Sequence, residues 1–238
     1  MTDARKELAT RIVDGLAGYF QFVHASRLLD MPGEDTAQFV MCQVLQAQQD
    51  YRVTVSDSPT NWTGGQRVDA GLLGRSVDAQ VWYGVVEVKW ITSSVQRETA
   101  RCSILEDCAR VASVVTGNLN AKLVVVGFTD DMVREVFDTV HPRGGTPEVQ
   151  RQFFATMLQR TIGSPISKSH DDLLKAFPNY QSRVPTNAQF TAGLVVSLLA
   201  EASIRSGADS VGHVFAWQVN QRPGRPPGAG ALVPGSTP

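Results

Sequence analysis

Residues 76–90 read SVDAQVWYGVVEVKW. Two runs rich in apolar and β-branched residues, 76–82 and 85–90, lie on either side of Tyr83-Gly84. Short runs of this kind, separated by a turn-forming pair, are typical of a β-hairpin. The stretch therefore predicts two adjacent antiparallel strands.

The hairpin predicts a cluster of charged side chains on one face. Side chains alternate along a strand, so Glu87 and Lys89 share a face, and the apolar residues between them point to the core. A turn centred on Trp82-Tyr83 sets Asp78 directly opposite Glu87. Two carboxylates and one ammonium then converge on one side of the hairpin.

This cluster has the composition of a site for phosphodiester hydrolysis. Two adjacent carboxylates repel each other unless a cation such as Mg²⁺ compensates their charge. A hard divalent ion polarises a phosphate and lowers the pKa of a bound water. A lysine beside it can orient the water or offset charge developing on phosphorus. We therefore expect Asp78 and Glu87 to bind metal and Lys89 to assist the reaction.

The order of elements predicts an α/β fold with a mixed central β-sheet flanked by helices. Apolar residues at helical spacing predict helices before and after the hairpin, and β-branched runs predict further strands. The interval 56–74, rich in Ser, Pro, Asn, Thr and Gly, is expected to be a long loop. The expected helices are 4–30, 34–49, 94–116, 130–140, 148–161, 170–176 and 187–205, and the other expected strands are 51–55, 122–128 and 211–219.

In this arrangement the chain resembles the PD-(D/E)xK superfamily, which includes restriction enzymes, repair nucleases and phage exonucleases. The pattern is an acid on one strand, here Asp78 after Val77 in place of proline, then (D/E)xK on the next, here Glu87-Val88-Lys89, then a helix. The resemblance covers roughly residues 34–137. It implies a restriction-endonuclease-like core and Mg²⁺, with Mn²⁺ as a substitute. It also implies nucleic acid as substrate, with DNA expected and RNA left open, in a restriction, defence or repair role.

Two alternatives to this set of ligands remain open. Glu34, in the first turn of the helix 34–49, is a candidate auxiliary metal ligand or a partner for Lys89. Gln38 follows one turn later, where relatives often have Glu, which puts two-metal chemistry in question. Asp69 could replace Asp78 as the first acid, although fewer strand-like residues flank it.

Several basic and polar residues are candidates for contact with nucleic acid. The helix after the motif carries Gln96, Arg97 and Arg101, near the expected path of substrate phosphates, and Arg75 precedes the hairpin. A solvated helix face with ordinary ion pairs explains the same residues equally well.

We divide the chain into three parts. Residues 1–140 form the expected nuclease-like core, 141–220 a mainly helical extension packed on it, and 221–238 a disordered tail rich in Pro and Gly. The apolar segment around 193–202 is a candidate interface for a homodimer or a larger complex.

Composition sets the remaining expectations. No apolar run approaches the roughly 20 residues of a membrane span, and no signal peptide is recognisable, so the predicted location is the cytoplasm. Three cysteines without CxxC spacing predict neither a disulfide framework nor a zinc site. The net charge of −1 provides no global attraction for DNA. The alternative to a nuclease is therefore a catalytically inactive, nuclease-like protein that binds nucleic acid or serves as a subunit of a complex.

Overall fold

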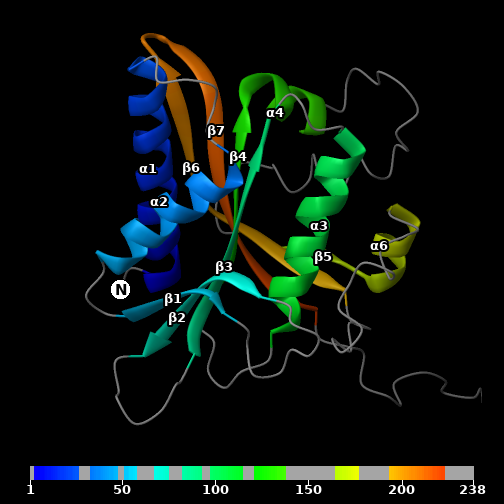
Figure 1. Ribbon diagram of the computed structural model, residues 1–238. Coiled ribbons are helices and arrows are strands. Elements are labelled where there is room, and N and C mark those ends of the chain that lie inside the picture. Colours follow the sequence, from blue (N-terminus) through cyan, green and yellow to red (C-terminus); the bar gives the residue numbers. More distant parts are fainter. Residues whose placement is uncertain are drawn as a thin grey trace, which may run out of the picture.

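The computed structural model describes residues 3–26, 33–47, 51–57, 67–74, 82–92, 97–114, 121–137, 164–176 and 193–222. They form a seven-stranded mixed sheet with helices on both faces (Figure 1), which confirms the predicted α/β class. The helices are α1 (Ala4–Ala25), α2 (Glu34–Gln46), α3 (Arg97–Ser113), α4 (Asp130–Phe137) and α6 (His170–Ala176). The strands are β1 (Tyr51–Asp57), β2 (Val68–Gly74), β3 (Trp82–Ile91), β4 (Ala121–Thr129), β5 (Ile166–Lys168), β6 (Leu194–Ser206) and β7 (Asp209–Gln221).

The strands lie in the order β1-β2-β3-β4-β7-β6-β5. The first three pair antiparallel, while β3 and β4 pair parallel. Two parallel neighbours need a crossover connection, and α3 lies in the segment that joins them. The remaining pairs, β4 with β7, β7 with β6 and β6 with β5, are antiparallel.

Each face of the sheet carries its own hydrophobic core. One core joins α1 and α2 to residues such as Val86, Val88 and Trp90, and the other joins α3, α4 and α6 to residues such as Val85 and Phe215. Figure 1 shows α1 and α2 on one side of the sheet and α3 and α6 on the other. The two cores explain why the central strands are apolar on both faces.

Trp90 is a central packing residue of the α1 side. Its ring stacks on that of Phe20 with centroids 3.8 Å apart, and its side chain is 5% exposed. Gly127, on the neighbouring strand β4, lies directly under the indole, so any Cβ there would collide with the ring. The absence of a side chain at 127 therefore makes room for the tryptophan.

The hairpin prediction is wrong in its details. Trp82 and Tyr83 lie inside the continuous strand β3, not in a turn. The strand that pairs antiparallel with β3 is Val68–Gly74, which the composition had assigned to a loop. The register aligns Ala70 with Val86, which brings the preceding residue, Asp69, alongside Glu87.

The prediction of a helical C-terminal extension is wrong over residues 194–206. Leu194–Ser206 is not a helix but strand β6, and it forms a long hairpin with β7 that extends the central sheet. Gly207, with φ of 64°, supplies the left-handed conformation that the tight turn needs. The strand predicted at 211–219 and the helix at 170–176 are confirmed as β7 and α6, whereas 148–161 and 223–238 lie outside the described residues. None of the described helices is long and apolar enough to cross a membrane.

Candidate functional site

The site begins on β3, where Glu87 and Lys89 point to the side of α3. The predicted alternation is confirmed, since Val86, Val88 and Trp90 pack on the opposite face. Both charged side chains are largely enclosed: Glu87 is 5% exposed and Lys89 15%. An enclosed charge needs partners, because burial without them costs several kcal/mol.

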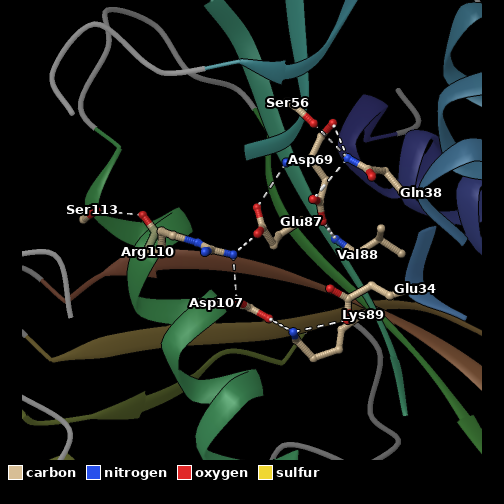
Figure 2. A network of polar contacts seen from close by, with 10 residues as sticks. All are labelled: Glu34, Gln38, Ser56, Asp69, Glu87, Val88, Lys89, Asp107, Arg110 and Ser113. Atoms are coloured by element: carbon tan, nitrogen blue, oxygen red, sulfur yellow. Dashed lines mark hydrogen bonds and ion pairs between the residues drawn. The ribbon is translucent and has the colours of Figure 1, made fainter. Parts of the chain in front are cut away.

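Asp69 on β2 lies beside Glu87. Its backbone N–H donates to Glu87 Oε2 over 3.3 Å, and its own Oδ2 accepts the backbone N–H of Val88 at 2.8 Å. The side-chain amide of Gln38 on α2 donates to Asp69 Oδ1 at 3.2 Å. Uncharged donors thus hold the Asp69 carboxylate, and the Asp69 backbone N–H links this residue to Glu87 on the neighbouring strand (Figure 2).

Lys89 joins the helices on the two faces of the sheet. Its Nζ lies 3.4 Å from Glu34 Oε2, at the first residue of α2, and 3.3 Å from Asp107 Oδ2 on α3. The partnership of Glu34 with Lys89, one of the two roles considered from sequence, is confirmed as a contact.

Asp107 and Arg110 belong to the site but were not predicted from sequence. They lie one turn apart on α3, and Arg110 Nη2 contacts Asp107 Oδ1 at 2.8 Å. The same nitrogen also forms an ion pair with Glu87 Oε1. A continuous chain of charges therefore runs from Glu34 through Lys89, Asp107 and Arg110 to Glu87, as Figure 2 shows.

Burial shapes the protonation of this cluster. It raises the pKa of Asp69, an effect that the Val88 N–H opposes and Glu34 reinforces. It also raises the pKa of Asp107 to about 7, although Lys89 opposes the shift. For Lys89, burial acts to lower the pKa, but Asp107 and Glu34 outweigh it and the net shift is upward. For Arg110 burial prevails and the pKa falls, although Asp69 and Glu34 oppose the change. Burial thus disfavours the ionised forms of Asp69 and Asp107, while Lys89 stays charged.

The raised pKa of Asp107 predicts a pH-dependent stability. The pKa in the folded chain lies above the ordinary 3.8, so protonation of Asp107 stabilises the fold. This contribution is complete below about pH 4 and is lost as the pH rises through about 7. In denaturant titrations with EDTA, the unfolding free energy of the wild type minus that of Asp107→Asn should fall between pH 5 and pH 8. We expect a fall on the order of 2 kcal/mol. A difference that does not change with pH would contradict the assignment.

The other predicted site residues either lie outside the described part of the chain or are buried away from solvent. Asp78, Arg75 and Gln96 lie outside the described residues, as does the side chain of Arg97. Arg101 does not lie on a solvated face: its side chain is 2% exposed, and its Nε donates to the Val136 carbonyl at 3.0 Å. Arg101 therefore ties α3 to α4, and the expectation that it contacts nucleic acid is wrong for the described conformation.

The described carboxylates could supply some, but not all, of the ligands that a divalent ion needs. Among the described residues, no three His, Cys, Asp or Glu side chains form a complete metal site. Asp69 and Glu87 supply two carboxylates, and Mg²⁺ commonly binds one or two, with waters and substrate phosphates as its other ligands. The pair could therefore supply two of the ligands of such an ion. The chain matches no protein-family model, no curated protein and no solved structure in the comparisons made with it.

Proposed function

We propose that the protein is a Mg²⁺-dependent nuclease of the PD-(D/E)xK kind that hydrolyses phosphodiester bonds, with DNA as its substrate. One observation carries the proposal: Asp69 and Glu87 lie side by side on neighbouring strands, with the Asp69 backbone N–H donating to Glu87 Oε2, and Lys89 follows two residues later on the same face as Glu87. In this assignment Asp69 takes the place that sequence reasoning gave to Asp78.

The surrounding elements support the proposal. The order α2-β1-β2-β3-α3-β4 places an acid on one strand, the ExK tripeptide on the next and a helix after it. Glu34 on the preceding helix contacts the lysine. These are the features on which the resemblance to the superfamily rests, now with the first acid on β2. The core proposed to be restriction-endonuclease-like extends from α2 to β4.

The roles of the residues follow from their surroundings. Asp69 and Glu87 would hold the ion, which when bound supplies a Lewis acid for the phosphate and a more acidic water. Gln38 and the Val88 N–H orient Asp69 without neutralising it, since both are uncharged donors. Lys89 is kept protonated by Asp107 and Glu34, so it offers a fixed positive charge to offset charge that develops on the phosphate.

The proposal is tested with plasmid DNA, linear DNA and RNA, each incubated with Mg²⁺, with Mn²⁺ and with EDTA. The wild type should cleave DNA only when a divalent ion is present. Lys89→Met keeps the apolar stem and removes the charge, and it should slow cleavage roughly 10²-fold. Because Asp107 can take up a proton, we expect the variant to fold. Cleavage that persists in EDTA, or equal rates in both proteins, would contradict the proposal.

A second candidate is a catalytically inactive, nuclease-like protein that binds nucleic acid. It is favoured by one contact: the guanidinium of Arg110 already neutralises Glu87, as a permanent counter-ion would. Calorimetric titration with Mn²⁺ separates the two functions. Heat of binding that disappears in Asp69→Asn supports the nuclease, whereas no heat in either protein supports the inactive alternative.

A further inference from the structure

Arg110 occupies a particular position in the charge network. The partners of Asp69 are uncharged donors from Gln38 and Val88, and Lys89 contacts Glu34 and Asp107. Among the described side chains, Arg110 is thus the one cation that contacts either proposed metal ligand, through its ion pair with Glu87. In the metal-free protein this guanidinium supplies the positive charge that Glu87 requires.

A guanidinium and a divalent ion compete for the same carboxylate. Both are attracted by the negative charge of Glu87, and each repels the other at short range. The described cluster holds four carboxylates, on Glu34, Asp69, Glu87 and Asp107, against two cations. When all four carboxylates are ionised, their excess negative charge is the amount that one divalent ion would balance. Glu87 becomes available to bind that ion only as Arg110 withdraws.

The side chain of Arg110 is able to withdraw. It is 29% exposed, whereas those of Glu87 and Asp107 are each 5% exposed. Its contact with Asp107, one turn earlier on the same helix, anchors the guanidinium independently of Glu87. In addition, the buried Nε has no hydrogen-bond partner among the residues that the structure describes.

These features suit a phosphate as the second partner. A guanidinium presents several N–H donors in a planar fork that matches phosphate oxygens, and charge-assisted bonds of this type are strong. Arg110 reaches Glu87 at the proposed metal site, so its donors lie next to the place where a substrate phosphate would complete the coordination of the ion.

We propose that Arg110 exchanges partners during the working cycle. Its guanidinium holds Glu87 in the metal-free protein, leaves Glu87 when a divalent ion binds, and then binds the phosphate of the substrate while Asp107 retains it. This inference rests on the proposed nuclease function. It assigns Arg110 two opposing effects, since it weakens the binding of metal alone and strengthens the binding of substrate.

The test measures both effects on the full-length chain. In calorimetric titrations with Mn²⁺ alone, Arg110→Met and Arg110→Gln should bind the ion roughly tenfold more tightly than the wild type, because a competing charge is gone. Arg110→Lys, which keeps the charge, should stay close to the wild type. In the presence of Ca²⁺ as a probe ion, Arg110→Met should bind a short DNA duplex roughly tenfold more weakly.

Arg205→Met is the matched control, since it removes one positive charge from an exposed position on β6. It should change neither affinity. A merely structural role for Arg110 would weaken both affinities together or leave both unchanged, and either result would overturn the exchange.

The inference and the proposed function fail in different ways. If the wild type binds Mn²⁺ through Asp69 but Arg110→Met and Arg110→Gln bind it no more tightly, the exchange alone is wrong. If the wild type binds no Mn²⁺, the nuclease function is wrong, and the exchange with it.

Discussion

Asp69→Asn should lower the rate of metal-dependent DNA cleavage roughly 10³-fold or more, since the loss of a metal ligand removes several kcal/mol of transition-state stabilisation. Asparagine has nearly the shape of aspartate, and its amide oxygen can still accept the Val88 N–H. What it lacks is the negative charge that would hold the ion. The loss should therefore appear in metal binding and in turnover together.

The same substitution should leave the fold intact. Burial raises the pKa of Asp69, which means that the ionised carboxylate destabilises the metal-free fold. A neutral amide at this position removes that cost. We expect the thermal midpoint of Asp69→Asn in EDTA to equal or exceed that of the wild type. A variant that is inactive because it misfolds would instead show a lower midpoint.

Asp78→Asn is the decisive comparison for Asp69→Asn. It tests the acid that sequence reasoning favoured, and it should cleave DNA at close to the wild-type rate. If Asp78→Asn is inactive and Asp69→Asn is active, the assignment from the β2–β3 register is wrong and the assignment from sequence is right.

Trp90→Ala should reduce the free energy of unfolding by about 3–5 kcal/mol, the range for removing a large buried aromatic side chain. The indole is enclosed between the ring of Phe20 and the backbone at Gly127, so its removal leaves a cavity that rigid neighbours cannot fill. Urea titration of the metal-free protein gives the measurement. A loss below about 1 kcal/mol would contradict the central role of this residue.

Two controls refine the Trp90 prediction. Phe22→Ala removes an aromatic ring from the same helix as Phe20, but that ring is 62% exposed, so we expect a change within about 0.5 kcal/mol. Trp90→Phe keeps most of the ring volume. It also removes an indole N–H that is buried without a hydrogen-bond partner in the described part of the chain, so it should cost much less than Trp90→Ala.

Glu87 and Lys89 could be placed from sequence because the information is local. Side chains alternate along a strand whatever its partners are, so these two residues share a face in any register. The apolar residues that alternate with them were predicted to point to the core, and in the structure they lie in the core on the α1 side.

The first acid could not be placed in the same way. It depends on which segment pairs with β3, and a shift of pairing changes every cross-strand neighbour. The strand that carries Asp69 reads VDAGLLG, and its two glycines and one aspartate are residues that strands usually lack. Burial between β1 and β3 overrides that local preference.

Asp107 and Arg110 were missed in the sequence for a different reason. The helix that carries them was predicted, but periodicity does not reveal which neighbours a helix face meets. One signal was available: the two residues are three apart and lie among residues that proved to be fully buried, such as Cys108 and Val111. Charged residues within a buried stripe indicate a polar partner opposite them.

The C-terminal hairpin was misassigned because its first strand contains good helix formers. The segment LVVSLLAEAS combines leucine, alanine and glutamate with β-branched residues, so its local preference is ambiguous. Twelve residue pairs with β7 stabilise the strand conformation over the helix. Such long-range pairing is not visible in the segment itself.

The position of β7 in the sheet has a consequence for synthesis of the chain. Every described residue of the proposed site precedes residue 111, but β4 acquires its second neighbour only when β7 follows, with Val125 pairing with Ala216. A nascent chain that has emerged as far as β4 therefore holds a complete set of site residues on a sheet with an open, apolar edge. Open edges and distant pairings slow folding and favour aggregation. Chaperone demand should consequently be greatest in the interval between emergence of β4 and emergence of β7.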